Sequence, residues 1–102
     1  MSNEKFVENM AFVRRCLNRR ASTLDYNEVR ALKNGKEMMD VILKNECYES
    51  VSGITREINI TIALINEALA QSKSLGRKKM LLYVKYRNQL KTIRRNATRI
   101  IK

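Results

Sequence analysis

The sequence predicts an all-α protein: a small antiparallel bundle of about four helices whose C-terminal helix is long, basic and amphipathic. The chain has no proline and three glycines among 102 residues, so few residues interrupt a helix. Hydrophobic residues make up 44% of the chain, as in globular domains. Apolar residues recur at the helical spacing of three and four. A chain of this length is expected to form one domain, residues 1–102.

The first helix is expected over residues 3–18. Its apolar positions, spaced by four, three and four residues, are Phe6, Met10, Val13 and Leu17. Its C-terminal end is basic, with Arg14, Arg15, Arg19 and Arg20. Cations stabilise this end of a helix because the last carbonyls carry partial negative charge. A ligand contact is the alternative interpretation of the cluster.

The second helix is expected over residues 25–45. Asp25 and Glu28 resemble a capping box in which Asp replaces Ser or Thr. Asn34-Gly35 interrupts the pattern, but Leu32 and Met39 keep the same phase across it, which favours one continuous helix. The acidic residues of this segment lie beside lysines and arginines, so ordinary surface pairing is expected for them. They are Asp25, Glu28, Glu37 and Asp40.

The third segment, residues 50–72, is the most apolar. Ile58, Ile60, Ile62 and Leu64 alternate with polar or small residues, which is a strand pattern. The sequence offers no second strand, and a lone strand would leave its backbone groups unpaired. We therefore predict a helix that is apolar on most sides. Such a helix lies at the centre of a bundle or at a dimer interface, and a homodimer is expected.

The fourth helix is expected to follow Gly76 and run to Ile101. Its apolar positions follow a 3-4-3-4-3 spacing: Tyr83, Tyr86, Leu90, Ile93, Ala97 and Ile100. Tyr83 and Tyr86 could stack on bases, but their place in the apolar stripe favours the edge of the core, with hydroxyl groups in contact with water.

The net charge of +11 is unevenly distributed. Residues 1–67 contain ten positive and ten negative side chains, whereas residues 68–102 contain eleven positive side chains and no acidic one. A neutral body with a purely cationic segment predicts a polyanionic partner. An ordinary solvated helix face is the alternative, but such a face usually carries both signs of charge.

On a helical wheel, seven cations of the fourth helix lie opposite its apolar face, and Arg87 and Arg94 lie on the boundary. The seven are Arg77, Lys78, Lys85, Lys91, Arg95, Arg99 and Lys102. From Arg77 to Lys102 this stripe extends about 38 Å. The predicted contacts are Arg77, Lys78, Lys85, Arg87, Lys91, Arg94, Arg95, Arg99 and Lys102, with Arg15 and Arg19 as a second contact.

A straight row of cations suits the phosphates of a duplex. Few base-reading side chains lie between them, which predicts sequence-independent binding of duplex nucleic acid, with dsRNA favoured over dsDNA. The alternative function is a helical protein-interaction module, an adaptor or inhibitor of viral or phage origin, that docks on an acidic protein. Membrane binding is not expected, because the apolar face of the helix is needed for packing.

Other functions find no support in the sequence. The chain has no histidine, no Gly-rich phosphate loop and no metal-ligand motif, so we expect no enzyme, no cofactor, no metal and no small-molecule substrate. Charged residues near the start interrupt any signal peptide. Cys16 and Cys47 are then expected to be free thiols in an intracellular protein, cytoplasmic or nuclear.

The general plan (about 100 residues, all-helical, one basic face, expected dimer) resembles that of the small nodavirus suppressors of RNA silencing. Those proteins hold dsRNA on paired long helices. The resemblance lies in the plan and implies dsRNA as the first ligand to test.

Overall fold

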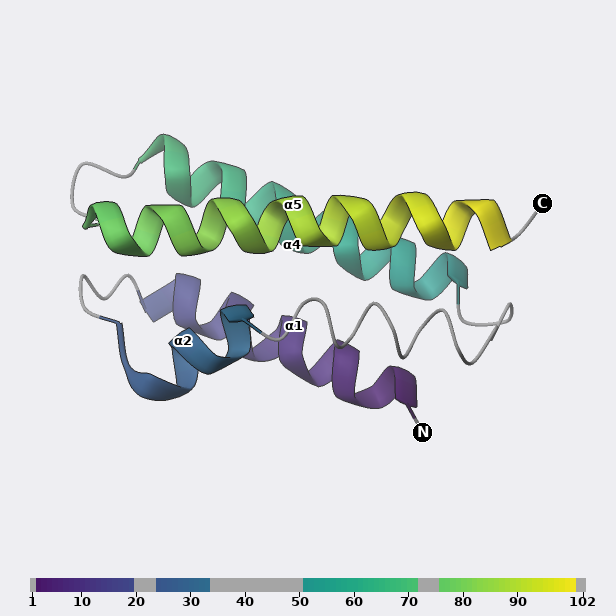
Figure 1. Ribbon diagram of the computed structural model, residues 1–102, viewed down its shortest axis with the longest axis horizontal. Helices are drawn as coiled ribbons and strands as arrows, with labels where there is room; N and C mark the ends of the chain where they lie inside the picture. Colours follow the sequence, from purple (N-terminus) through teal and green to yellow (C-terminus); the bar gives the residue numbers. More distant parts are fainter. Residues whose placement is uncertain (1, 20–23, 34–50, 72–75, 101–102) are drawn as a thin grey trace.

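The computed structural model describes residues 2–19, 24–33, 51–71 and 76–100. Within these ranges the regular elements are all α-helices: α1 (Ser2–Arg19), α2 (Tyr26–Lys33), α4 (Val51–Ala70) and α5 (Arg77–Ile100) (Figure 1). The all-helical prediction is confirmed for this part of the chain. The predicted continuation of the second helix across Asn34-Gly35 to Asn45 lies outside the described residues, as do Glu37 and Asp40.

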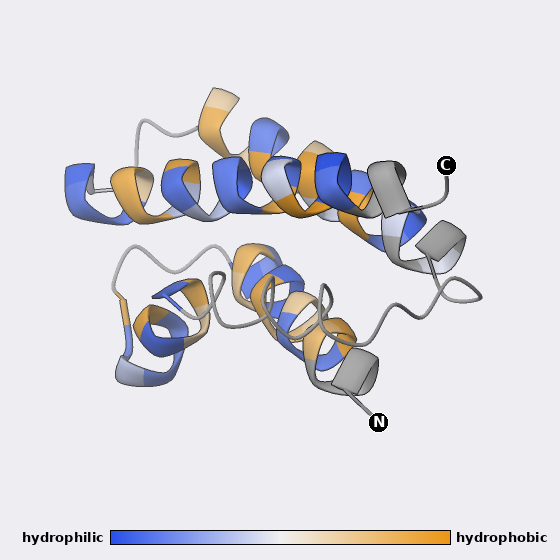
Figure 2. Cartoon of the chain, turned by 45° about the vertical axis from the view of Figure 1, so that its right-hand side comes forward, coloured by the Kyte–Doolittle hydropathy of each residue, from blue (hydrophilic) through white to orange (hydrophobic). Residues whose placement is uncertain are grey.

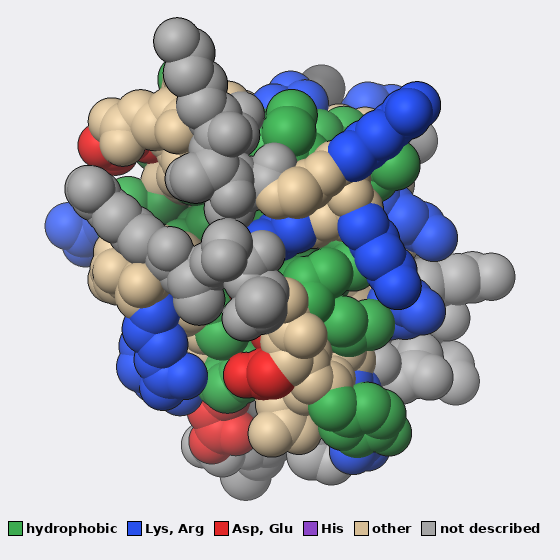
Figure 3. Space-filling model, turned by 90° about the vertical axis from the view of Figure 1, so that its left-hand side faces the viewer, with side chains coloured by type: hydrophobic (Ala, Val, Ile, Leu, Met, Phe, Trp, Pro, Cys, Tyr) green, Lys and Arg blue, Asp and Glu red, His purple; other side chains and the backbone are tan. Residues whose placement is uncertain are grey.

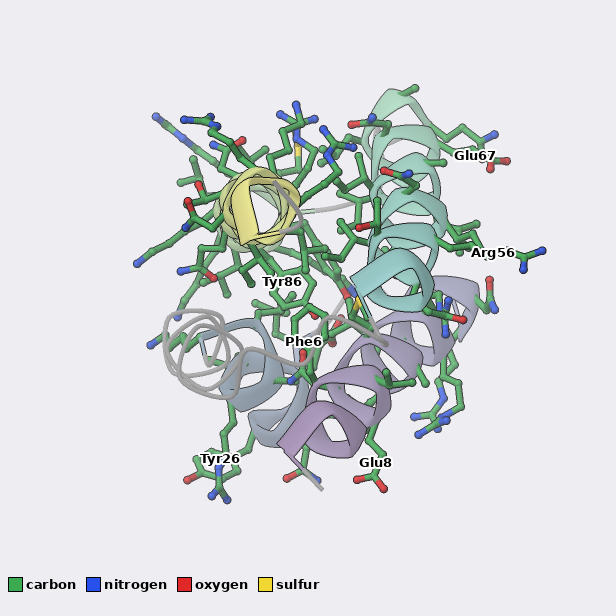
Figure 4. The ribbon with its side chains drawn as sticks, turned by 90° about the vertical axis from the view of Figure 1, so that its right-hand side faces the viewer. Phe6, Glu8, Tyr26, Arg56, Glu67 and Tyr86 are labelled. Atoms are coloured by element: carbon green, nitrogen blue, oxygen red, sulfur yellow. The ribbon has the colours of Figure 1, made fainter. Side chains whose placement is uncertain are left out.

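The four described helices occupy the corners of a bundle. The helix α5 packs on α4 and on α2, and α1 packs on the same two helices. The view along α5 shows the result: α4 and α2 lie at the other two corners, so α5 and α1 lie on a diagonal, across the core from each other (Figure 4). Outward faces of these two helices therefore point to different sides of the molecule.

The core is built from the faces that the helical spacing predicts. Apolar side chains of all four helices meet inside. Hydrophobic and hydrophilic residues alternate along each helix, as amphipathic helices require (Figure 2). The buried cluster consists of Phe6, Met10, Val13, Ala31, Leu32, Ile58, Ile62, Ile65, Tyr83, Tyr86, Leu90 and Ile93. Full burial of one large apolar side chain contributes about 1.5–3 kcal/mol, so this cluster holds the helices together.

The structure settles the conflict between strand and helix in the third segment. Ile58 and Ile62 are buried, whereas Ile60 is 44% exposed, as the helical period requires and an alternating strand does not. Thr61 is also buried, and its hydroxyl donates a hydrogen bond to the carbonyl of Glu57 at 2.8 Å. This bond within the helix satisfies a polar group that would otherwise be costly to bury.

The start of α2 shows half of the predicted capping box. The backbone N–H of Glu28 donates to Asp25 Oδ1 at 2.7 Å, and the N–H of Val29 donates to the Asp25 carbonyl at 3.1 Å. Asp25 is therefore the N-cap. The Glu28 carboxylate does not complete the box, because it points into the core.

Candidate nucleic-acid interface

The outer face of α5 carries five cations that are exposed to solvent. They are Arg77, Lys78, Lys85, Lys91 and Arg95, all five of them predicted contacts. The helix has no acidic residue from end to end. We call these five residues the basic face. Viewed from the end where α5 begins, Lys and Arg side chains project into solvent, with hydrophobic side chains beside them (Figure 3).

The opposite side of α5 anchors the helix. Tyr83, Tyr86, Leu90 and Ile93 are at most 1% exposed, which confirms that the two tyrosines belong to the core. The prediction that their hydroxyl groups meet water is wrong. The Tyr86 hydroxyl donates to Asn9 Oδ1 at 2.6 Å, and the Tyr83 hydroxyl donates to the Glu28 carboxylate. Buried hydroxyls require such partners because water cannot reach them.

The hydrogen bond of Tyr86 belongs to a longer connection between helices. Asn9 uses its amide nitrogen to donate to the Ala31 carbonyl at 3.1 Å, while its oxygen accepts from Tyr86. One side chain of α1 thus connects α2 and α5. Burial raises the pKa of the Tyr86 hydroxyl above its ordinary value, because the charged form would lose its hydration.

One cation of α5 lies inside the protein. Lys79 is 3% exposed, and its Nζ atom lies 3.4 Å from Glu28 Oε1 and 6.0 Å from the centre of the Tyr83 ring. Glu28 is 3% exposed, so the surface pairing expected for it is wrong. Burial, followed by the hydrogen bond to Glu28, raises the pKa of the Tyr83 hydroxyl. We call Glu28, Lys79 and Tyr83 the buried ionic cluster.

The helical wheel of α5 indicates that Lys79 is buried. Lys79 precedes Tyr83 by four residues, which places it about 40° from Tyr83 and inside the apolar sector of the helix. The position of Lys79 among the apolar residues indicates burial, and a buried lysine requires a carboxylate partner. The partner itself could not be read from local spacing, because it comes from another helix.

Two further arginines lie where α5 meets α4. Arg87 donates to Asn66 Oδ1 and Arg94 donates to Asn59 Oδ1, both at 2.7 Å. The two arginines are seven residues apart on α5, and the two asparagines are seven residues apart on α4. The arginine that comes first along the chain contacts the asparagine that comes second. Both arginines are half-buried, which confirms their predicted place at the boundary of the apolar face. Both amide partners are uncharged, and both arginines lie beside the basic face.

The structure does not bring Arg15 and Arg19 to the basic face. Both are exposed on α1, on the side opposite the buried Met10 and Val13, and α1 lies on the diagonal from α5. Arg15 also lies over the ring of Phe12, 5.8 Å from its centre. These two residues are exposed cations on a different side of the molecule.

Two further predicted contacts lie at the C-terminal end of the chain. The side chain of Arg99 and the whole of Lys102 lie outside the described residues. Arg14, which belongs to the basic end of the first helix, pairs with Glu57 of α4 at 2.6 Å. This arginine therefore connects α1 to α4.

The described residues also limit the chemistry of other sites. They contain no group of three or more His, Cys, Asp or Glu side chains that could hold a metal ion. Cys16 is buried, and its pKa is raised by that burial and by the nearby Glu28 charge. None of the described helices is both long enough and apolar enough to cross a bilayer.

Comparisons of the chain with protein-family models, with curated proteins and with solved structures find no match. The physical properties of the surface are therefore the basis for a functional proposal.

Proposed function

We propose that this protein binds duplex nucleic acid without reading its sequence, through the basic face of α5, and that it prefers dsRNA to dsDNA. The observation that carries the proposal is the row of five exposed cations on a helix that has no acidic residue. Such a row suits closely spaced phosphates, because binding releases the counterions condensed around them.

The rigidity of α5 supports this function. Its inner side is fixed by buried tyrosines, so the cations on its outer side need little ordering when a ligand binds. From Arg77 to Arg95 the face extends about 27 Å, somewhat less than one turn of a duplex, about 34 Å. Asn88 is an exposed polar residue among the cations, which leaves few groups to read bases.

The preference for RNA follows from how α5 begins. A recognition helix that enters the major groove of DNA usually has base-reading side chains in its first turns, whereas α5 begins with Arg77 and Lys78. Both are suited to phosphates. In this proposal an antiparallel bundle presents α5 to the minor-groove side of an RNA duplex. The protein would sequester dsRNA, as suppressors of RNA silencing do, and would catalyse no reaction.

The test is a binding series with fluorescently labelled dsRNA, dsDNA and single strands of random sequence. Fluorescence anisotropy measures the binding at several salt concentrations. If all five cations contact phosphates, log K against log salt for dsDNA has a slope of about −4.5. We expect dsRNA to bind more tightly than dsDNA at equal salt. The absence of duplex binding at low salt would refute the proposal.

Neutralising substitutions locate the contact. Lys91→Gln and Arg95→Gln should each weaken duplex binding and reduce the salt slope by about 1, whatever the sequence of the duplex. Arg30→Gln is the matched control, because it removes the same charge from an exposed position of α2 that is not among the predicted contacts. An equal effect of all three variants would mean that net charge, and not the basic face, determines binding.

A second function has one observation in its favour. Leu81 is 62% exposed on the basic face, between Lys78 and Lys85. Phosphates do not need an apolar neighbour, whereas the centre of a protein interface usually contains one. The second candidate is therefore an interaction module that docks on an acidic protein. Leu81→Gln should leave duplex binding within about twofold, whereas loss of this side chain would weaken a protein complex much more.

A further inference from the structure

The side of α4 that faces away from the core has an unusual composition. Its exposed residues follow a 3-4-3-4-3 spacing and are Gly53, Arg56, Ile60, Ala63, Glu67 and Ala70. Three of the six are glycine or alanine, one is an exposed isoleucine, and two carry opposite charges. We call these six residues the α4 outer stripe. Over its 18 positions it extends about 26 Å.

No contact among the described residues accounts for the small residues. A Cβ atom built on Gly53 would have no neighbour within 4 Å, so a larger side chain would fit there. Ile60 is 44% exposed although it is a large apolar residue. A close approach by another helix would explain both observations, since small residues permit it and Ile60 would be covered.

The two charged residues of the stripe are available for such an approach. The side chains of Arg56 and Glu67 both extend from α4 away from the bundle (Figure 4). In the part of the chain that the structure describes, neither side chain has a hydrogen bond or an ion-pair partner. They point to a partner that presents the opposite charges at the same spacing.

A second copy of α4 presents these charges. The stripe is symmetric about the peptide bond between Thr61 and Ile62, with Gly53 and Ala70, Arg56 and Glu67, and Ile60 and Ala63 at equal distances on either side. We propose that the α4 outer stripe forms a two-fold symmetric dimer in which the α4 helices of two copies run antiparallel across this midpoint. A two-fold axis requires a surface that complements itself in this way.

This register satisfies each part of the stripe. Arg56 lies opposite the partner's Glu67, and symmetry repeats the pair on the other side of the axis. Ile60 packs against the partner's Ala63 near the centre. Gly53 lies opposite the partner's Ala70 at each end. The alternating spacing of three and four is that of helices which pack side by side with a small crossing angle.

The proposed dimer does not depend on nucleic-acid binding. The α4 outer stripe lies on a different side of α4 from Asn59 and Asn66, which contact α5. The basic face therefore remains exposed in the dimer, and two copies of it flank the paired α4 helices. Molecular mass and duplex affinity can be measured separately, so failure of either proposal leaves the other testable.

The experiment measures the mass of the full chain by sedimentation equilibrium over a dilution series. We expect a monomer–dimer equilibrium for the wild-type chain. Arg56→Glu should raise the dimer dissociation constant by about tenfold or more, because symmetry converts two ion pairs into two like-charge contacts. Glu67→Arg should have the same effect. The combined Arg56→Glu, Glu67→Arg variant should restore the wild-type dissociation constant to within about threefold, because the pairs are only exchanged.

Controls with the same charge changes lie elsewhere on the surface. Glu8→Arg on α1 matches Glu67→Arg, and Arg30→Glu on α2 matches Arg56→Glu, since both residues are exposed. Neither control should change the dissociation constant by more than about twofold. Far-UV circular dichroism verifies the helix content of each variant. If a reversed charge prevents folding, Ala63→Gln tests the close approach without a charge, and it too should weaken the dimer.

Three results would overturn the proposed dimer. The first is a monomeric mass for the wild-type chain at every concentration. The second is a dimer that the single reversals weaken no more than the controls do, which would mean that the copies meet on another surface. The third is a double reversal that remains as weak as the single ones, which would mean that Arg56 does not face the partner's Glu67.

Discussion

Removing the ammonium group of Lys79 should destabilise the protein far more than removing that of its neighbour Lys78. Lys79 lies in the buried ionic cluster, where its side chain is 3% exposed and that of Glu28 is 4% exposed. In the variant Lys79→Met a side chain of similar length keeps the apolar packing. The Glu28 carboxylate then stays buried, with the Tyr83 hydroxyl still donating to it but with no cation at 3.4 Å.

The expected loss follows from that geometry. Breaking a buried ion pair by removing one partner typically costs about 3–5 kcal/mol, because an uncompensated charge remains in the core. A change of 1 kcal/mol shifts the melting temperature of a domain of this size by about 4–8 °C. A loss of about 3 kcal/mol therefore lowers the melting temperature by about 12–24 °C. The total stability of such a domain is about 5–15 kcal/mol, so the variant should still fold at low temperature.

Urea denaturation followed by circular dichroism measures the free energy of unfolding of each variant. Lys78→Met is the matched control: Lys78 is exposed, and its replacement should change stability by less than about 0.5 kcal/mol. The double variant Lys79→Met, Glu28→Gln should lose less than the sum of the two single variants, because the glutamine oxygen can still accept from Tyr83 without a charge. A loss below about 1 kcal/mol for Lys79→Met, or full additivity in the double variant, would refute the buried pair.

Three further predictions concern other described groups. Because burial raises the pKa of Tyr83 and of Tyr86, stability should be complete below about pH 10, where the unfolded chain keeps its tyrosines protonated, and should fall as the pH rises above it. Each Tyr→Phe substitution should reduce the loss of unfolding free energy per pH unit by about 1.4 kcal/mol, as measured by urea denaturation on both sides of pH 10. Cys16, which is 5% exposed with a raised pKa, should react with a thiol reagent about a hundredfold more slowly in a folded Cys47→Ser chain than in the unfolded one, and equal rates would contradict its burial. Asp25→Ala should cost about 0.5–2 kcal/mol through loss of the N-cap, whereas Asn at this position should retain most of the stability because its oxygen can accept the same bond.

The sequence was sufficient to predict the helices and the inner side of α5. Tyr83, Tyr86 and Leu90 follow the helical period closely, and burial at that spacing is a local property of the chain. In the third segment Ile58, Ile60 and Ile62 also alternate like a strand, and the lack of a second strand to pair with them favoured the helix.

The pairing of charges across helices could not be predicted in this way. Glu28 has Arg30 and Lys33 close to it in sequence, so local spacing indicated a surface pair. Its partner Lys79 lies 51 positions later, and only the packing of α2 on α5 brings the two together. The separation of Arg19 from the basic face has the same origin, since the position of α1 in the bundle depends on long-range packing.

The amide partners of Arg87 and Arg94 have a consequence for handling this protein in solution. A hydrogen bond from guanidinium to an uncharged amide is less sensitive to ionic strength than attraction between exposed opposite charges. Salt concentrated enough to elute the protein from a polyanionic column should therefore leave the contact between α4 and α5 intact. The eluted protein should be folded and able to bind again once the salt is removed.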